Sequence, residues 1–245
     1  MSVDYSLEDN LKLFSSQSFK DGVKQAIGVP ALGLGSSMFA FGAFLHSAGF
    51  DIYQSFFSTF FTFALPGQFV MAETILAGGT LLNVFLAVLL TNSRLYPMTV
   101  NIIPVIRDSQ TPKWKQYLGA HFVAVTSWFN MFAVHKSIKQ EEKFDYFIGL
   151  GGFLWANSVL CTVAGYLFSN LVSYEILIGL VFINPMYFLV MTVSNLKEKK
   201  MICSIFCGAI LSVLLNDIFP GWSILVAGIV AGSLGYFIFK DEVYE

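Results

Sequence analysis

The feature that most constrains this chain is a series of long apolar runs without a single charged residue. The runs cover residues 25–50, 52–72, 74–93, 116–134, 146–174, 176–196, 201–216 and 218–239. A helix needs about 20 apolar residues to cross about 30 Å of hydrocarbon. Strands of a membrane barrel would alternate apolar and polar residues, which 176–196 does not do. We therefore expect an all-α, polytopic integral membrane protein with about six to eight membrane segments.

Composition supports this class and excludes others. Hydrophobic residues make up 56% of the chain and charged residues 12%, against roughly 45–50% and about 25% in soluble domains. The net charge of -2 gives no basic face for nucleic acid. Cys161, Cys203 and Cys207 lie inside apolar runs and have no nearby ligand set, so we expect neither a disulfide framework nor a metal. No enzyme or nucleotide-binding signature appears, and we predict no enzymatic activity and no cofactor.

The positive charges give a constraint on topology. Lys and Arg gather at Lys12, Lys20 and Lys24, at Arg107, Lys113 and Lys115, at Lys197, Lys199 and Lys200, and at Lys240. Loops rich in these residues tend to stay in the cytoplasm, which requires an even number of crossings between clusters. The apolar segments between them are 25–48, 52–78 and 80–106, then 116–135, 144–168 and 172–195. Each group contains three segments, an odd number. A path in which every segment crosses the membrane therefore conflicts with the rule that loops rich in Lys and Arg are cytoplasmic.

One resolution is that each triplet contains a segment that turns back inside the bilayer or is broken into half-helices. In the first triplet, 52–78 is interrupted at 65–68, where a Pro-Gly pair removes a hydrogen-bond donor and frees the chain. In the second, 116–135 is short and carries His121, Thr126, Ser127 and Asn130. The alternative is that Lys136, Lys139 and Lys143 form an external loop and one cluster breaks the rule.

The predicted organisation follows from these segments. Residues 1–24 form a cytoplasmic or interfacial arm, 25–240 a single transmembrane transport domain, and 241–245 a cytoplasmic tail. The transport domain contains a possible duplicated three-segment unit, with halves 25–106 and 116–195, followed by a hairpin at 201–240. In that hairpin, Gly228, Gly232 and Gly235 would place small residues on one face, where another helix could approach closely.

Charged residues within the apolar segments mark the candidate site, because a charge kept inside a membrane is costly. Glu73 follows the Pro66-Gly67 interruption and could pair with Arg94. Arg94 belongs to the polar run Thr91-Asn92-Ser93-Arg94, which would line a pathway or brace a broken helix. The alternative reading is that Glu73 reaches an interface and Arg94 is an interfacial anchor.

Three motifs resemble the AzlC family, the large subunits of bacterial branched-chain amino-acid exporters. Phe19-Lys20-Asp21-Gly22-Val23, with Gly28-Val29-Pro30 and Phe41-Gly42, is similar to the family's first span. Phe63-Ala64-Leu65-Pro66-Gly67-Gln68-Phe69 resembles its small-residue break, and Asn92-Ser93-Arg94-Leu95-Tyr96 resembles its Asn-x-Arg signature. The likeness covers about residues 19–135. It departs at Val125-Thr126-Ser127-Trp128, where family members commonly carry an Asp-Glu pair, and this puts the coupling ion and substrate in question.

The resemblance implies export of leucine, isoleucine and valine with a small hydrophobic AzlD-type subunit, in the bacterial cytoplasmic membrane with a cytoplasmic N-terminus. Broken helices suit a substrate carboxylate through their free N–H groups. We therefore expect Gly67, Gln68, Asn92 and Arg94 to bind substrate and Glu73 to be a possible proton or ammonium partner. The alternative hypothesis is a passive channel or a structural membrane component.

Overall fold

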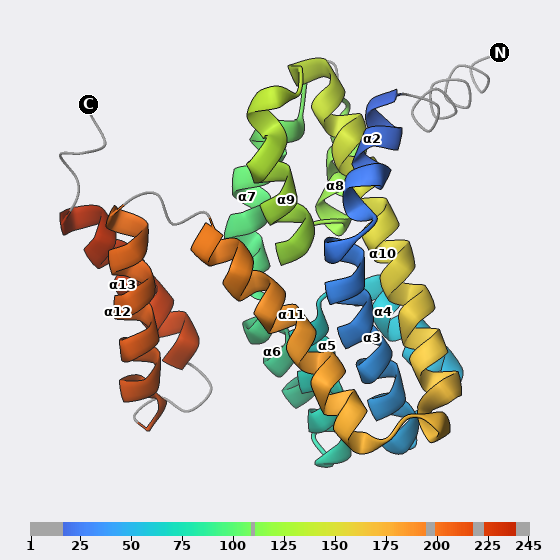
Figure 1. Cartoon of the computed structure of the whole chain (residues 1–245). Helices are drawn as coiled ribbons and strands as arrows, with labels where there is room; N and C mark the ends of the chain where they lie inside the picture. Colours follow the sequence, from blue (N-terminus) through green and yellow to red (C-terminus); the bar gives the residue numbers. More distant parts are fainter. Residues whose placement is uncertain (1–16, 109–110, 195–198, 218–222, 239–245) are drawn as a thin grey trace. The chain divides into compact units, whose positions relative to one another are not determined.

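The computed structural model describes residues 17–108, 111–194, 199–217 and 223–238, and these contain helices and connecting turns (Figure 1). The chain divides into two compact units, Met1–Tyr187 and Phe188–Glu245. Unit 1 contains α2 (Gln17–Ala26), α3 (Val29–Ser47), α4 (Ile52–Thr62), α5 (Leu65–Leu76), α6 (Leu81–Asn92), α7 (Leu95–Ile106), α8 (Lys113–His121), α9 (Val125–Val134), η1 (His135–Ser137), η2 (Gln140–Glu142), α10 (Lys143–Phe168), η3 (Ser169–Leu171) and the start of α11 (Tyr174–Ser194). Unit 2 contains the end of α11, α12 (Lys199–Asn216) and α13 (Ser223–Ile238).

Helix α10 is the scaffold of unit 1, and α2 and α3 lie along it (Figure 1). Glycines allow the backbones to touch: Gly42 of α3 faces the Thr162 carbonyl, and Gly165 of α10 faces the Phe39 carbonyl. A Cβ at either glycine would overlap those backbone atoms. Small residues give the close approach that helix pairs in membranes need, because apolar side chains gain little by leaving lipid for each other.

The two ends of α10 define the two ends of unit 1, named here the Lys143 end and the Phe168 end. Helix α3 runs parallel to α10, because Ala31 accepts a hydrogen bond from Asn157 at 3.0 Å and Phe50, beyond the end of α3, accepts one from Tyr166 at 2.9 Å. The pair α6 and α7 is bent by 49° at Ser93-Arg94. Its far end lies at the Lys143 end, where the α7 residue Ile106 joins the same core as Phe144.

Helices α4 and α5 form a first hairpin that opens at the Phe168 end. The chain leaves α3 at Phe50 and enters α4 through a capping box made by Asp51 and Gln54. It turns at Phe63, whose φ of 41° is left-handed, and Ala64. Helix α5 then runs back along α3, so that Ala72 packs against Phe41 and Leu45. The hairpin is 11 and 12 residues deep, or about 17 Å at 1.5 Å per residue.

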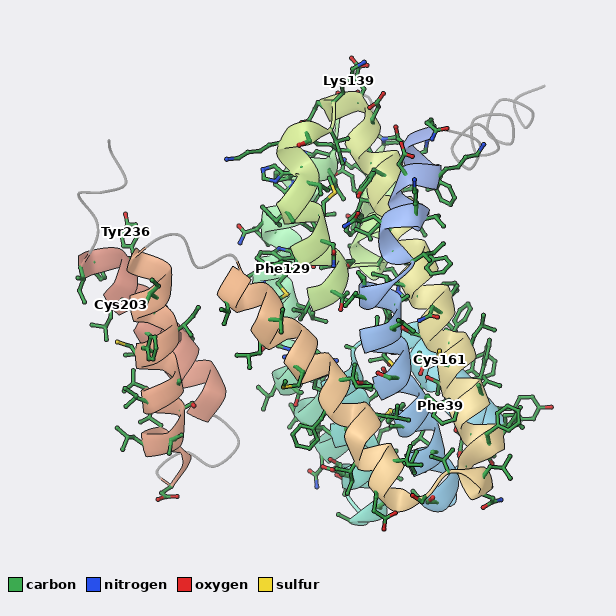
Figure 2. All side chains as sticks on the ribbon, viewed as in Figure 1. Phe39, Phe129, Lys139, Cys161, Cys203 and Tyr236 are labelled. Atoms are coloured by element: carbon green, nitrogen blue, oxygen red, sulfur yellow. The ribbon has the colours of Figure 1, made fainter. Side chains whose placement is uncertain are left out.

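Helices α8 and α9 form a second hairpin that opens at the opposite, Lys143 end. Its turn covers Phe122, Val123 and Ala124. After α9, Gln140 returns to the end of α7 and donates hydrogen bonds to the carbonyls of Val105 at 3.0 Å and Arg107 at 2.8 Å. The loops before and after the hairpin therefore lie together, at the end where Figure 2 places Lys139. The second hairpin therefore begins and ends at the same end of unit 1.

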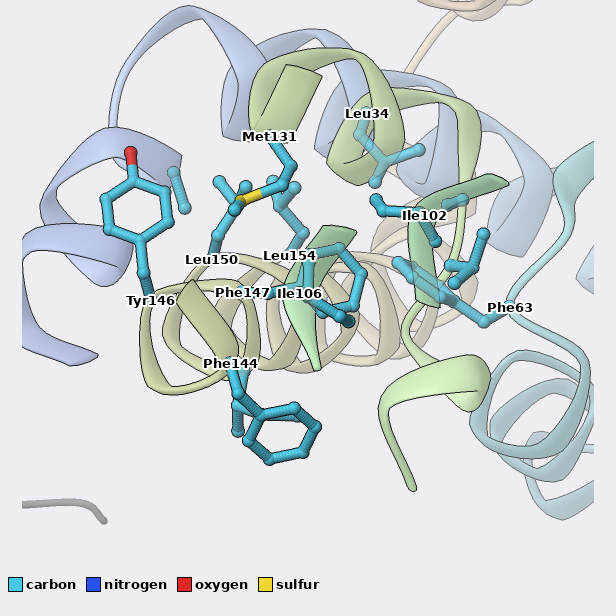
Figure 3. Packing of buried hydrophobic residues seen from close by; sticks show 14 of the residues in the cluster. Leu34, Phe63, Ile102, Ile106, Met131, Phe144, Tyr146, Phe147, Leu150 and Leu154 are labelled. Atoms are coloured by element: carbon cyan, nitrogen blue, oxygen red, sulfur yellow. The ribbon is translucent and has the colours of Figure 1, made fainter. Parts of the chain in front are cut away.

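A single apolar core joins α3, α7, α9 and α10 (Figure 3). Its fully buried members include Ile102, Met131, Phe147, Leu150 and Leu154, each at most 1% exposed. The tip residue Phe63 joins the same cluster. This core fixes the turns of the two hairpins against the middle of the scaffold.

Many large apolar side chains lie on the outer surface of unit 1. Helix α6 has no buried residue, and Leu81, Leu82 and Phe85 are 87%, 63% and 59% exposed. Such continuous apolar surface is unusual on a soluble monomer and is typical of a surface covered by lipid or a partner. Helices at Val29–Ser47 and Gln140–Leu171 are long and apolar enough to cross a membrane, and the bent pair α6–α7 would be a third.

Unit 2 is a helical hairpin as far as it is described, and a Cβ built on Gly208 of α12 would lie 3.5 Å from the Cβ of Ala231 of α13. Ala227 and Ala231 are 1% and 2% exposed and form the packed face of α13. Gly228 and Gly232 are exposed and have open space beside them. The glycine pair therefore faces away from α12.

The all-α prediction is confirmed for the described residues, whereas the number of membrane segments and the domain boundaries stay predictions. Residues 1–16 of the predicted arm and the tail 241–245 lie outside the described residues. The interruption predicted at 65–68 was misplaced: the break is at Phe63-Ala64, and Pro66 and Gly67 lie in the first turn of α5. Proline is tolerated there because first-turn N–H groups have no helical acceptor. The segment 80–106 is also bent.

Candidate functional site

The tips of the two hairpins meet at Trp155, in the middle of α10. The Trp155 indole Nε1 donates to the Phe60 carbonyl in the last turn of α4 at 3.0 Å, and the two rings lie 4.8 Å apart. On its other side, the Trp155 ring lies 6.0 Å from the His121 ring and 5.9 Å from the Phe122 ring at the second tip. Two helix breaks that enter from opposite ends of unit 1 thus share one contact residue.

Both hairpins place a helix N-terminus at this level. In α5 the first helical hydrogen bond is from Gln68 N to Ala64 O, at 3.1 Å, and in α9 it is from Trp128 N to Ala124 O, at 2.9 Å. The preceding amides of each helix have no acceptor within it. Aligned peptide dipoles add partial positive charge at each start. The centre of unit 1 therefore has two positive helix ends, which favour a negatively charged group.

A buried chain of hydrogen bonds links the first tip to the scaffold. Gln68 Nε2 donates to Thr59 Oγ1 at 2.8 Å, Thr59 and Thr162 share a hydroxyl contact of 3.0 Å, and Thr162 donates to a carbonyl at 2.9 Å. Gln68, Thr59 and Thr162 are all 0% exposed. The last acceptor is the carbonyl of Ser158, one turn earlier on α10. Gln68 is thereby fixed although its helix is broken.

Gly67 lies directly against Asn92 at the end of α6. A Cβ built on Gly67 would overlap the Asn92 carboxamide. Gly67 has no unusual backbone angle, so the close approach of the Asn92 side chain is what requires glycine at this position. The structure thus brings together three of the sequence-predicted residues, Gly67, Gln68 and Asn92.

Four buried polar side-chain atoms lack a hydrogen-bond partner among the described residues, and three of them lie on the hairpins or at the α6–α7 bend. They are Gln68 Oε1, Asn92 Oδ1 and Trp128 Nε1, and the fourth is Ser169 Oγ. An unpaired buried polar atom costs about 1–3 kcal/mol. Two of the three are acceptors, and the indole N–H is a donor. These atoms are available to a ligand that both donates and accepts hydrogen bonds.

The second tip is closed by Ser127, whose Oγ accepts from Ala124 N at 2.9 Å and lies 2.6 Å from the Phe122 carbonyl. Ser127 is one of the two residues that stand where the resembled family commonly has carboxylates. Here it acts as a turn-closing hydroxyl, which fixes the start of α9 beside Trp128.

The other two sequence-predicted residues lie apart from this group. Arg94 is the first residue beyond the α6 bend and is exposed. Glu73 is exposed near the end of α5. In the part of the chain that the structure describes, no ion pair joins them. Their roles in binding stay predictions.

Sequence reasoning missed Thr59, Thr162, Trp155 and Trp128. Each lies in an apolar run with no charge or motif to mark it. The contacts of Thr59, Thr162 and Trp155 follow from the antiparallel packing of α4 against α10, and Trp128 lies on α9; no local pattern specifies either arrangement. The only available signal was the repeated occurrence of single polar residues in runs otherwise made of Phe and Leu.

A separate cavity of about 600 Å³ lies between α3, α10 and α11. Its walls are almost entirely apolar, with residues such as Leu32, Phe39, Phe153 and Ile176. Its one carboxamide, Asn157, is bonded to the Ala31 carbonyl. Charged groups of a ligand would find no partner there, so this cavity is not the candidate site.

A comparison with protein families finds one that matches over residues 30–172, and its description is "AzlC protein". The match covers α3 to η3 and includes both hairpins and the whole of α10. Comparisons with curated proteins and with solved structures give no match.

Proposed function

Because this chain belongs to the AzlC family, whose members act in membrane transport, we propose that it exports small amino acids across a membrane. The proposed substrates are leucine, isoleucine and valine, and the chain is the large subunit of a two-component secondary exporter. The transport role follows from the family and the branched-chain substrates follow from the resemblance given above, and the chemistry of the hairpin tips supports this substrate class.

The observation that carries the substrate class is the set of unpaired buried atoms around the tips. Gln68 Oε1 and Asn92 Oδ1 can accept hydrogen bonds from a substrate ammonium, whereas Trp128 Nε1 can donate to a carboxylate. The N-termini of α5 and α9 add favourable potential for the carboxylate. Phe63, Leu65 and Met98 line the neighbouring core and suit an aliphatic side chain. An amino-acid zwitterion with an apolar side chain satisfies all of these groups.

The two hairpins suggest how access alternates. The first hairpin opens toward the Phe168 end and the second toward the Lys143 end, and both tips contact Trp155. Movement of one tip away from Trp155 would expose the site to one side while the other tip keeps it closed. Broken helices that carry a site at mid-membrane are a common arrangement in secondary transporters.

We place the Lys143 end in the cytoplasm of a bacterium, with the protein in the cytoplasmic membrane and the N-terminus inside. In the described part of unit 1, every Lys and Arg except Arg94 lies on α2, at the end of α7, on α8, or between η1 and the start of α10. The connections at the Phe168 end contain none. Short loops rich in Lys and Arg stay inside. If neither hairpin crosses the membrane, this rule agrees with the count of apolar segments.

For the partner we propose a small hydrophobic AzlD-type subunit that docks on α13. Gly228 and Gly232 lie one turn apart, are exposed and have no atom near the position of a Cβ. A partner helix could therefore approach the α13 backbone closely. Replacing both glycines with Leu should abolish co-purification of the subunit, whereas the same change at Ile210, an exposed residue of α12, should not.

The experiment that tests the function is leucine counterflow in proteoliposomes that contain the full chain and the small subunit. A carrier exchanges internal for external leucine at a rate that saturates with leucine concentration. Gln68→Leu should reduce this rate at least about tenfold, because the hydrogen bond between Gln68 and the charged ammonium group of the substrate is lost. Uptake that never saturates would favour a channel, and no leucine movement at all would contradict the proposed substrate.

A further inference from the structure

The hydrogen-bond chain from Gln68 to α10 has a direction that the donors themselves determine. It contains three contacts: Gln68 to Thr59, Thr59 to Thr162, and Thr162 to the Ser158 carbonyl. A carbonyl can only accept, so the Thr162 proton is used on Ser158. The Thr59 proton must then go to Thr162, and only Gln68 Nε2 remains to fill the first contact.

The opposite orientation of the Gln68 carboxamide fails this count. With Oε1 toward Thr59, the three contacts would have only the two threonine protons to share, and one contact would lose its hydrogen bond. Assigning an amide by its network is the proper basis for its orientation. The chain therefore turns Nε2 toward Thr59 and leaves Oε1, which is buried and unpartnered, as the free atom.

The far end of the chain is held rigidly. Thr162 and Ser158 are on α10, and the Thr162 carbonyl lies against Gly42 of α3 with no room for a side chain between them. Thr59 is also held by its neighbour Phe60, whose carbonyl is bonded to Trp155. This relay of hydroxyl groups, Thr59 and Thr162, thus fixes the orientation of the Gln68 side chain, in the first turn of α5, relative to α10.

We propose that Thr59 and Thr162 are positioning residues that turn an acceptor oxygen of Gln68 into the site, and so make the site select the ammonium group of its ligand. This inference rests on the proposed function and specifies the ligand chemistry at the same site. Thr162 is linked to Gln68 through Thr59 and needs no contact with the ligand.

If Thr162 orients Gln68, the effect of replacing Thr162 depends on which residue stands at position 68. A residue that only packs would not show this dependence. In Thr162→Val the Thr59 proton loses its acceptor and becomes free to donate to Gln68 Oε1. The carboxamide then turns over and presents its NH₂ group to the ammonium. In Gln68→Glu the side chain has an oxygen on both sides, so the loss of the Thr162 hydroxyl no longer matters.

The test measures binding of two probes, leucine and 3-methylbutylammonium, to the purified full chain in detergent. Thr162→Val should raise Kd for both probes about tenfold or more, the effect of losing a hydrogen bond to a charged group. In the Gln68→Glu background the same substitution should change Kd by no more than about twofold, the usual limit of additivity for uncoupled sites. Thr162→Ser keeps the hydroxyl and should bind as wild type does.

Ser158→Ala is the matched control. Ser158 is as buried as Thr162 and lies one turn away, but it takes part through its backbone carbonyl, while its hydroxyl donates to Leu154 at 2.8 Å. Its loss should leave Kd unchanged. Thr59→Val, with the same predicted rescue by Gln68→Glu, replaces Thr162→Val if the latter does not fold.

The outcomes separate the two proposals. Wild-type Kd for leucine in Thr162→Val overturns the relay and leaves the proposed function standing, as does an equal loss of affinity in both Gln68 backgrounds. Relay-dependent binding of 3-methylbutylammonium without binding of leucine overturns the proposed function and supports the relay. Binding of neither probe to the wild type overturns both.

Discussion

Trp155 donates a hydrogen bond of 3.0 Å to the carbonyl oxygen of Phe60, and this bond ties the last turn of α4 to the middle of α10. The carbonyls at the end of a helix have no partner within it. At a break inside a membrane, no bulk water replaces that partner. The Trp155 indole therefore donates a hydrogen bond to a carbonyl at the end of α4, as water does at a helix end on a protein surface.

Trp155→Phe should destabilise the protein while keeping most of its apolar packing. The loss of one partly buried hydrogen bond predicts a decrease in unfolding free energy of about 0.5–1.5 kcal/mol. Melting of the purified chain in detergent measures it. An unchanged melting temperature would show that the α4 end is held by packing alone.

Trp128→Phe makes the same change as Trp155→Phe but should affect stability and leucine binding in the opposite way. The Trp128 Nε1 has no acceptor among the described residues, so its removal costs no hydrogen bond and should leave the melting temperature the same or slightly higher. If this N–H binds the substrate carboxylate, Kd for leucine should rise about tenfold, and Kd for 3-methylbutylammonium, which lacks a carboxylate, should not change. A lower melting temperature with unaltered leucine affinity would contradict the assignment.

Gly67→Ala should displace Asn92 and weaken leucine binding by about tenfold, because the new methyl group overlaps the Asn92 carboxamide. Gly152→Ala on α10 is the control, since open space lies beside Gly152, and alanine favours a helix by up to about 1 kcal/mol over glycine. Adding Asn92→Ala to Gly67→Ala removes the overlap. The pair should regain thermal stability but not leucine affinity, and recovery of both would exclude Asn92 from the site.

How much of the fold and of the candidate site could be predicted depended on the kind of sequence pattern. The apolar runs predicted helices throughout, and the Pro66-Gly67 pair led to the right hairpin although it misplaced the turn by two residues. The turn lies at Phe63, because a left-handed residue ends α4 and Pro66 is compatible with a first helical turn. Local composition marks the weak point of a segment, whereas the exact break depends on packing.

The conflict between positive loops and segment counts was the most informative sequence signal. It led to a second non-crossing segment at 116–135, and the structure has a hairpin there, with Gln140 bonded to the end of α7. The relay through Thr59 and Thr162 could not be foreseen in this way. These residues are 103 positions apart, and an isolated threonine in an apolar run usually bonds to its own helix, as Thr91 and Thr99 do here.

The two hairpins make a prediction about sidedness that needs no assumption about substrate. In a chain without native cysteines, Lys113→Cys and Lys139→Cys should react with a membrane-impermeant maleimide from the same, cytoplasmic side, because Gln140 lies against the end of α7 just before α8. Ser47→Cys and Ala77→Cys, which flank the first hairpin, should react from the opposite side. All four positions are exposed, so reactivity reports sidedness. Labelling of Lys113→Cys and Lys139→Cys from opposite sides would mean that 113–134 crosses the membrane, and the site between the tips would not exist.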